Sequence, residues 1–216
     1  MKVYDISLPV TENMPVYKGK PEKRPVFGIA SDFATGQVYE TRLEMNLHTG
    51  THLDAARHIF PQGGTVDGIA LCNVVCKCRV LDLLEVPVKI TADDLAVQDI
   101  AAGDFILLKT RNSYQPVLEG QFIYLAESGA KYLADKKVCG VGIDALGIER
   151  DQPGHPVHRL LLGAGMPVLE GLNLKAPPAG SYLLIAAPIY IIGVEAAPVR
   201  ALLLEQAVPD EIEFMM

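Results

Sequence analysis

The chain is organised around one segment of eleven residues, His48-Thr49-Gly50-Thr51-His52-Leu53-Asp54-Ala55-Ala56-Arg57-His58, which holds three of its five histidines and a carboxylate. Neutral imidazole and carboxylate are the ligands that bind zinc, manganese or iron. A histidine beside such a site commonly carries protons near neutral pH. A lone histidine is more often a hydrogen-bonded structural residue. The clustering therefore predicts a metal site.

The backbone around the first two histidines is predicted to turn rather than to form a helix. His48 and His52 stand four residues apart, a spacing that on a helix would put both imidazoles on one face, as in zinc proteases. Thr49-Gly50-Thr51 disfavours a helix and allows a tight turn, and no glutamate follows the first histidine. We expect a strand over 38–47, then a glycine turn that folds both histidines and Asp54 inward, with the last histidine on a short helical turn.

Length, charge and hydropathy limit the classes of partner. With 216 residues, the chain fits one domain spanning 1–216. A net charge of −7 and a pI of about 5.2 argue against nucleic acid, which needs a positive field. Half of the residues are hydrophobic and the mean hydropathy is +0.22, which is typical of apolar surface covered by another subunit and also of a well-filled single core. We expect a small-molecule substrate and a homo-oligomer.

Neither export nor membrane insertion is expected. The first seven residues contain no apolar run of secretory type and no cleavage site of small residues. The longest apolar stretch, 182–194, is interrupted by Pro188 and is shorter than the roughly eighteen residues of a membrane span.

The cysteines are predicted to act as small core hydrophobes. Cys72, Cys76 and Cys78 alternate with Lys77 and Arg79, which is typical of a strand with one buried face running from 72 to 84. Unpaired core thiols agree with a reducing cytoplasm.

Strands and helices alternate along the rest of the chain, which indicates an α/β fold. A proline- and glycine-rich loop over 9–21 has the character of a lid. The glycines near 140 do not match a dinucleotide fingerprint, so we read them as close packing and expect no nucleotide. Apolar runs and capping residues predict strands at 25–30, 37–47, 104–110, 138–144, 166–170, 182–187, 189–194 and 199–204. They predict helices at 91–96 and 127–136, and a third helix that starts after Pro156 and ends at Gly163 or Gly165.

The two remaining histidines lie around the start of the last predicted helix. That helix can start after Pro156 and carry His158 in its first turn. Glu170 ends the short strand that follows, a usual position for site residues in α/β sheets. His155 precedes a proline and is interpreted as a turn residue, outside the ligand set.

The motif from His48 to Asp54, with His58 four residues on, resembles the signature of the metal-dependent cyclase family that includes bacterial kynurenine formamidases. The segments His158-Arg159-Leu160-Leu161-Leu162 and Glu170-Gly171-Leu172-Asn173-Leu174 resemble the downstream part of that family. The resemblance implies a single compact α/β domain of swivelling β/β/α type with a mixed central sheet. It also implies a homodimer or homotetramer and one or two divalent metal ions, zinc or manganese.

The resemblance also implies a role for each site residue. His48 and His52 would bind the first metal, Asp54 would bridge, and His158 with Glu170 would complete a second site. His58 stands at the general acid/base position. The chain departs from the family pattern at Ala56, where a proline is usual, and at Ile59, where an aromatic residue is common. Tyr17 stands where the formamidases tend to carry a tryptophan that lines the substrate pocket, so Tyr17 is the candidate substrate-binding residue.

We therefore predict hydrolysis of an amide-type bond by metal-activated water, in an arylformamide such as N-formylkynurenine or in a related lactam or lactone. His58 would move the proton, a role that contributes roughly 10²–10⁴-fold. Two alternatives stay open, namely a metal-dependent cyclase or dehydratase and a non-catalytic metal-binding module. Arg57 is open to pairing with a substrate carboxylate or to an ordinary surface salt bridge.

Overall fold

A nine-stranded mixed sheet forms the centre of the computed structural model, which describes residues 1–115 and 121–205. Four central strands run parallel and the strands on either side are antiparallel. The predicted α/β fold with a mixed central sheet is confirmed. In spatial order the strands are β1 (Lys2–Asp5), β13 (Leu202–Glu205), β11 (Gly180–Ile185), β5 (Val75–Asp82), β7 (Phe105–Lys109), β9 (Gly140–Ile143), β10 (Val168–Glu170), β4 (His52–Asp54) and β12 (Ala196–Pro198).

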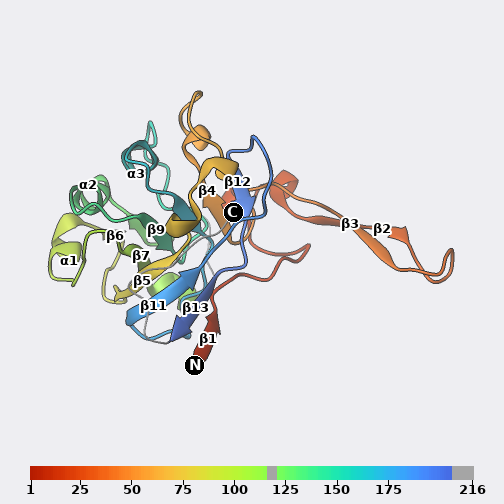
Figure 1. Cartoon of the computed structure of the whole chain (residues 1–216), viewed down its shortest axis with the longest axis horizontal. Coiled ribbons are helices and arrows are strands. Elements are labelled where there is room, and N and C mark those ends of the chain that lie inside the picture. Colours follow the sequence, from red (N-terminus) through yellow and green to blue (C-terminus); the bar gives the residue numbers. More distant parts are fainter. Residues whose placement is uncertain (116–120, 206–216) are drawn as a thin grey trace.

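Three helices cover one face of this sheet (Figure 1). They are α1 (Ala92–Ala96), α2 (Glu127–Asp135) and α3 (Pro156–Gly163), close to the three predicted helices. Thr91 caps α1 through a capping box with Asp94, because the first amides of a helix need acceptors outside it. Pro156 occupies the first turn of α3, where its missing N–H costs nothing.

Alternation along β7 divides the core into two clusters. Ile106 and Leu108 pack under the helices, whereas Phe105 and Leu107 pack into the concave side of the sheet. All five residues of β7 are buried, as expected for a central strand covered on both faces. A Cβ on Gly140 would lie 2.2 Å from the Phe105 ring, which confirms the close-packing role predicted for the glycines of this region.

The sheet curls until its first strand meets the neighbourhood of β4 and β10. Ser7 forms a β-bridge with Leu172, and the Asn173 amide donates to the carbonyl of Ile6 over 2.9 Å. The Leu8 amide donates to Oγ1 of Thr51 over 2.8 Å. This closure brings the turn before β4 against the segment that follows β10.

Several smaller elements lie outside the central sheet and its three helices. A parallel pair joins β6 (Lys89–Ile90) to β8 (Tyr124–Leu125), and the antiparallel hairpin of β2 (Val26–Ser31) and β3 (Glu40–Glu44) extends away from the body (Figure 1). We call residues 26–44 the arm. The single-turn 3-10 helices are η1 (Tyr17–Gly19), η2 (Pro21–Lys23), η3 (Ala56–His58), η4 (Val66–Gly68), η5 (Leu71–Asn73) and η6 (Arg111–Tyr114). No helix of the described ranges combines the length and the apolar character needed to cross a bilayer.

Two predicted strands are present but shorter than expected, and a third is absent. The strand expected over 37–47 is shorter and belongs to the arm, where all five residues of β3 are exposed, so it has no buried face. Cys72 lies exposed in η5, because the cysteine-rich strand begins only at Val75. The run over 189–194 forms a loop bounded by Pro188, which lacks an amide donor, and by Gly193 with a φ of +79°.

Candidate metal centre

Two neighbouring strands place three of the predicted ligands on one patch. His52 and Asp54 are two residues apart on β4, so their side chains point to the same face of the sheet. Glu170 ends β10, and the antiparallel register pairs it directly with His52. The carboxylates and the imidazole therefore converge because of strand geometry, although more than a hundred residues separate β4 from β10 along the chain.

Glycines allow the turn before β4 to approach β10 closely. Gly50 has a φ of +73° and Gly171 a φ of +68°, a region that residues with a Cβ rarely adopt. A Cβ on Gly171 would lie 2.1 Å from the carbonyl oxygen of Gly50. Oγ1 of Thr51 donates to the carbonyl of Gly171 over 2.6 Å, which fixes the turn that carries His48.

Imidazole nitrogens surround the carboxylate of Asp54. His48 Nδ1 lies 2.9 Å and His52 Nε2 lies 3.5 Å from Asp54 Oδ1. His158 Nε2, from the first turn of α3, lies 3.6 Å from Asp54 Oδ2. Glu170 adds a second carboxylate, with its two oxygens 3.4 Å from His52 Nε2 and 3.4 Å from His158 Nε2. The structure thus brings together all five predicted ligands.

The donor set fits a divalent cation. Within the described residues, His52 Nε2 and both carboxylate oxygens of Asp54 are buried without a hydrogen-bond partner, a costly state for polar and charged atoms. Among the described residues, three groups of three offer ligand atoms within 4.8 Å of one another. Two of them contain Asp54, namely His48 with Asp54 and His58, and His52 with Asp54 and Glu170, and the third is Glu149 with His155 and His158. Nitrogen and oxygen donors of this kind suit zinc or manganese.

The pKa shifts of the clustered side chains also favour a cation site. Burial alone would raise the pKa of Asp54, but the imidazoles of His52, His158 and His48 hold that pKa well below its usual range. Burial opposes protonation of His52, yet Asp54 and Glu170 raise its pKa to about 9. Burial and Asp54 oppose ionisation of Glu170, while His158 and His52 lower its pKa to about 2. The two buried carboxylates therefore require positive charge beside them.

His58 lies at the edge of this cluster. It ends η3, the short helical turn predicted from the sequence, and its ring centroid is 4.3 Å from that of His48 and 5.3 Å from that of His158. The side chain is half-buried, and burial lowers its pKa from the usual value. Its place beside Asp54 suits either a metal ligand or a neutral proton acceptor.

The cluster opens into a cavity of about 200 Å³. Tyr17 lies on its wall, whereas Arg57 is exposed and is not among the lining residues. Three polar lining residues fall outside the sequence prediction. They are Lys23 from η2, Glu149 from the loop before α3 and His155 at the N-terminus of α3. Lys23 and Glu149 are far from the histidine motif in sequence, so only the folded chain places them beside it, whereas His155 is visible in the sequence but was interpreted as a turn residue because a proline follows it.

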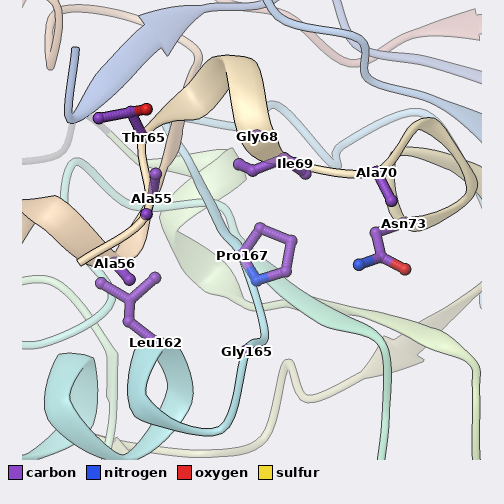
Figure 2. A pocket seen from close by; sticks show the side chains of 11 residues that line it. Ala55, Ala56, Thr65, Gly68, Ile69, Ala70, Asn73, Leu162, Gly165 and Pro167 are labelled. Atoms are coloured by element: carbon purple, nitrogen blue, oxygen red, sulfur yellow. The ribbon is translucent and has the colours of Figure 1, made fainter. Parts of the chain in front are cut away.

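A second cavity of about 260 Å³ is lined in part by Ala55 and Ala56, which follow Asp54 in the chain. Figure 2 shows small and apolar side chains around it, with Leu162 and Pro167 in its wall and the amide of Asn73 at one end. It contains no histidine or carboxylate. The chemistry therefore belongs to the smaller cavity.

Known proteins are similar to this chain in sequence and fold. Residues 4–150 match the model of the cyclase family, whose description is "Putative cyclase". A kynurenine formamidase from Salinibacter ruber (strain DSM 13855 / M31) is 33% identical over 206 residues, covering 94% of this chain and 97% of the relative. The structure of a predicted metal-dependent hydrolase from Bacillus stearothermophilus is 50% identical with a TM-score of 0.86, covering 94% and 97% of the two chains. Isatin hydrolase A from Labrenzia aggregata, 24% identical with a TM-score of 0.82 over 95% and 94%, shares the fold.

Proposed function

The chain belongs to the cyclase family, and we propose that it is a metal-dependent hydrolase that cleaves an amide-type bond in an aromatic substrate. An arylformamide such as N-formylkynurenine is the first candidate, and a related lactam or lactone is the second. The observation that carries this proposal is the group of buried, unpartnered ligand atoms on His52 and Asp54 beside a cavity lined by His58. Similarity to the kynurenine formamidase supports the formamide.

We propose that the centre holds one or two divalent ions, zinc or manganese. His48, His52 and Asp54 would hold the first ion, and Asp54 with His158 and Glu170 the second. Asp54 can serve both because each of its oxygens faces a different imidazole. A bound divalent cation polarises a carbonyl and lowers the pKa of water to roughly 7.

His58 is the proposed proton carrier. It lines the cavity at the edge of the ligand cluster, where it can take a proton from the attacking water and deliver it to the departing amine. Burial favours its neutral form, which is the form that accepts a proton.

Tyr17 and Lys23 are the proposed substrate-binding residues. The Tyr17 ring packs edge-on against Phe122 with centroids 6.4 Å apart, so an aromatic surface lines the cavity wall. Lys23 is the one lysine or arginine among the described lining residues, with its Nζ 5.7 Å from the Tyr17 centroid. It is therefore better placed than Arg57 to bind a substrate carboxylate.

We also propose that the chain assembles with further copies of itself through the arm, as a homodimer or homotetramer. A two-stranded hairpin is at best marginally stable alone in water. The arm nevertheless exposes seven large apolar side chains, Val26, Phe27, Ile29, Phe33, Val38, Tyr39 and Leu43.

The four free cysteines support a reducing, cytoplasmic location.

The substrate proposal is tested by product analysis on metal-loaded protein. Purified protein would be stripped with a chelator, reloaded with zinc or manganese, and given N-formylkynurenine, isatin, a lactone and a hydroxyacid. We expect hydrolysis of the formamide or the lactam only in the loaded samples. Water elimination from the hydroxyacid would instead assign a dehydratase. Stoichiometric metal without any turnover would assign a binding module.

A further inference from the structure

Glu149 is a buried acid that lies outside the proposed ligand set. Only 2% of the residue is exposed, although it stands on the loop between β9 and α3. Its Oε2 accepts a hydrogen bond from the amide of Val157 over 3.1 Å, in the first turn of α3. Its Oε1 lies 2.5 Å from Nδ1 of His158. One carboxylate therefore holds both the start of the helix and the imidazole that the helix carries.

The two nitrogens of His158 face different partners. Nδ1 points to Glu149, while Nε2 points to the carboxylates of Asp54 and Glu170. An ionised carboxylate can only accept a hydrogen bond. When the His158 ring is neutral, Glu149 therefore selects the tautomer with the proton on Nδ1. That tautomer leaves the lone pair of Nε2 directed at the metal centre.

The same arrangement recurs at His52. Its Nδ1 lies 3.0 Å from the carbonyl oxygen of Gly50, which also only accepts, and its Nε2 faces Asp54 and Glu170. A backbone carbonyl thus orients one imidazole and a buried carboxylate orients the other. Partners of this kind fix the tautomer and ring orientation of histidine ligands in metal sites.

The distances separate this role from that of a ligand. Two donors bound to one tetrahedral zinc at about 2.0–2.2 Å stand about 3.3 Å apart. Oε1 of Glu149 and Nδ1 of His158 are closer than that, at the distance of a short hydrogen bond between the two groups. The exposed His155 Nδ1 approaches the same oxygen at 3.2 Å, so Oε1 has a neighbour on each side.

We propose that Glu149 is a positioning residue for the metal centre, which holds His158 in the tautomer and orientation that present Nε2 to a cation. This inference rests on the metal centre of the proposed function, and it does not depend on the substrate. Glu149 therefore does more than cap α3, because by orienting His158 it also raises the affinity of the centre for its metal.

The experiment measures the zinc dissociation constant of the full-length protein by competition with a fluorescent chelator, alongside the melting temperature of the metal-free form. Glu149→Met removes the acceptor and keeps the volume. Glu149→Gln retains one acceptor oxygen for Nδ1 and loses the charge. Asp151→Asn is the matched control, since Asp151 is exposed, pairs with Lys18, and has a φ of +55° that asparagine tolerates.

We expect Glu149→Met to weaken zinc binding by about 10- to 100-fold, Glu149→Gln to lose less, and Asp151→Asn to bind as wild type does. The metal-free Glu149→Gln protein should melt near wild type while its affinity is still reduced. The proposal would be overturned if Glu149→Gln bound zinc as tightly as wild type and the weaker zinc binding of Glu149→Met were matched by a lower melting temperature. That result would assign Glu149 a purely structural role. Failure of wild type to bind zinc would overturn the metal centre itself, whereas zinc binding without hydrolysis would count against the proposed substrate alone.

Discussion

Asp54 has an unusual position among the described acids of this chain, because both of its oxygens are buried and have only imidazole nitrogens and no backbone amide facing them. An isolated buried carboxylate in such surroundings would be strongly destabilising. The histidines around it offset part of that cost by accepting protons, which is why the pKa of His52 rises to about 9. A divalent cation would meet the same need and release those protons.

Replacement of His58 tests the proton carrier. Turnover by His58→Ala should fall roughly 10²- to 10⁴-fold while the metal content measured by atomic emission stays at the wild-type value. Arg57→Ala, one residue away and exposed, should keep wild-type turnover on a substrate without a carboxylate. If His58→Ala instead loses one equivalent of metal, the residue is a ligand, and unchanged turnover would remove it from the mechanism.

Lys23 tests how the substrate is held. A hydrogen bond to a charged group is worth about 1.5–3 kcal/mol, so Lys23→Ala should raise KM for N-formylkynurenine at least about tenfold. KM for formanilide, which has no carboxylate, should not change. Lys20→Ala, which alters an exposed lysine nearby, serves as the control. An equal rise in KM for both substrates would show that Lys23 does not recognise the carboxylate.

The sequence predicted the ligands more completely than their surroundings. His48, His52 and Asp54 are close in sequence, so their clustering is visible without a fold. His158 and Glu170 were found through the family resemblance. Lys23 and Glu149 reach the cavity only through tertiary folding, and an isolated lysine or glutamate in a loop carries no signal of that contact.

At the scale of elements, the short pairing of β4 with β10 sets the geometry of the centre. Three residue pairs define this register, and they align Glu170 with His52 and Val168 with Asp54. A slip by one residue would turn every side chain of β4 to the opposite face. Gly50 and Gly171 protect the register, because the close approach of their backbones leaves no room for a side chain on Gly171.

A buried aspartate fixes a neighbouring loop. The carboxylate of Asp144 accepts hydrogen bonds from the amides of Thr110 and Ser113 over 2.9 and 3.2 Å, and from both hydroxyls over 2.7 Å. The Ser113 hydroxyl in turn accepts from the Leu174 amide over 2.8 Å. This network ties η6 to the end of β9 and to the segment after β10.

The same aspartate predicts a dependence of stability on pH. Burial raises the pKa of Asp144 from 3.8 to about 6, against the hydrogen bonds from Ser113 and Thr110, so the folded state binds this proton more tightly than the unfolded chain. The stability that this proton contributes is fully present below pH 3.8 and is lost as the pH rises through about 6. Asp144→Asn cannot titrate. The difference in unfolding free energy, wild type minus variant, should fall by about 2–3 kcal/mol between pH 4 and 7.

Urea unfolding of both metal-free proteins across that range measures the difference and cancels the titration of all other groups. Parallel profiles for wild type and Asp144→Asn would show that Asp144 has the same proton affinity in both states.

Element types were predicted well where caps and long apolar runs agreed, as in α1, β7 and α3. Errors arose where apolar character did not mean burial. Residues 189–194 read as a strand, yet Ile189, Tyr190 and Ile192 are more than half exposed. An apolar β-branched run has the same sequence pattern whether it packs inside the chain or covers a surface that another chain can meet.

At the scale of the whole molecule, the apolar side chains of the arm are the main departure from an ordinary monomer surface. Ile29, Phe33 and Val38 are 64%, 75% and 56% exposed, and the arm has no part of its own chain packed over it in Figure 1. A specific interface usually buries more than about 1,000 Å², a size that an extended hairpin against a second copy can supply.

Light scattering after size-exclusion chromatography tests this assembly. The wild-type mass should be two or four times 23.4 kDa, and the double variant Ile29→Glu, Phe33→Glu should elute as a monomer because four buried carboxylates per dimer would repel and lose their hydration. Val97→Glu is the control, since Val97 is 83% exposed and lies beyond α1. A monomeric wild type, or a double variant with wild-type mass, would contradict assembly through the arm.

We propose that the cluster around Asp54 is a metal centre that hydrolyses an amide-type bond. The most direct measurement titrates zinc or manganese into chelator-stripped protein while following hydrolysis of N-formylkynurenine. The rate should be near zero in stripped protein, rise in proportion to bound metal, and level off at one or two equivalents, while Asp54→Asn binds no metal and stays inactive. Full turnover by stripped protein, or by Asp54→Asn, would contradict the claim.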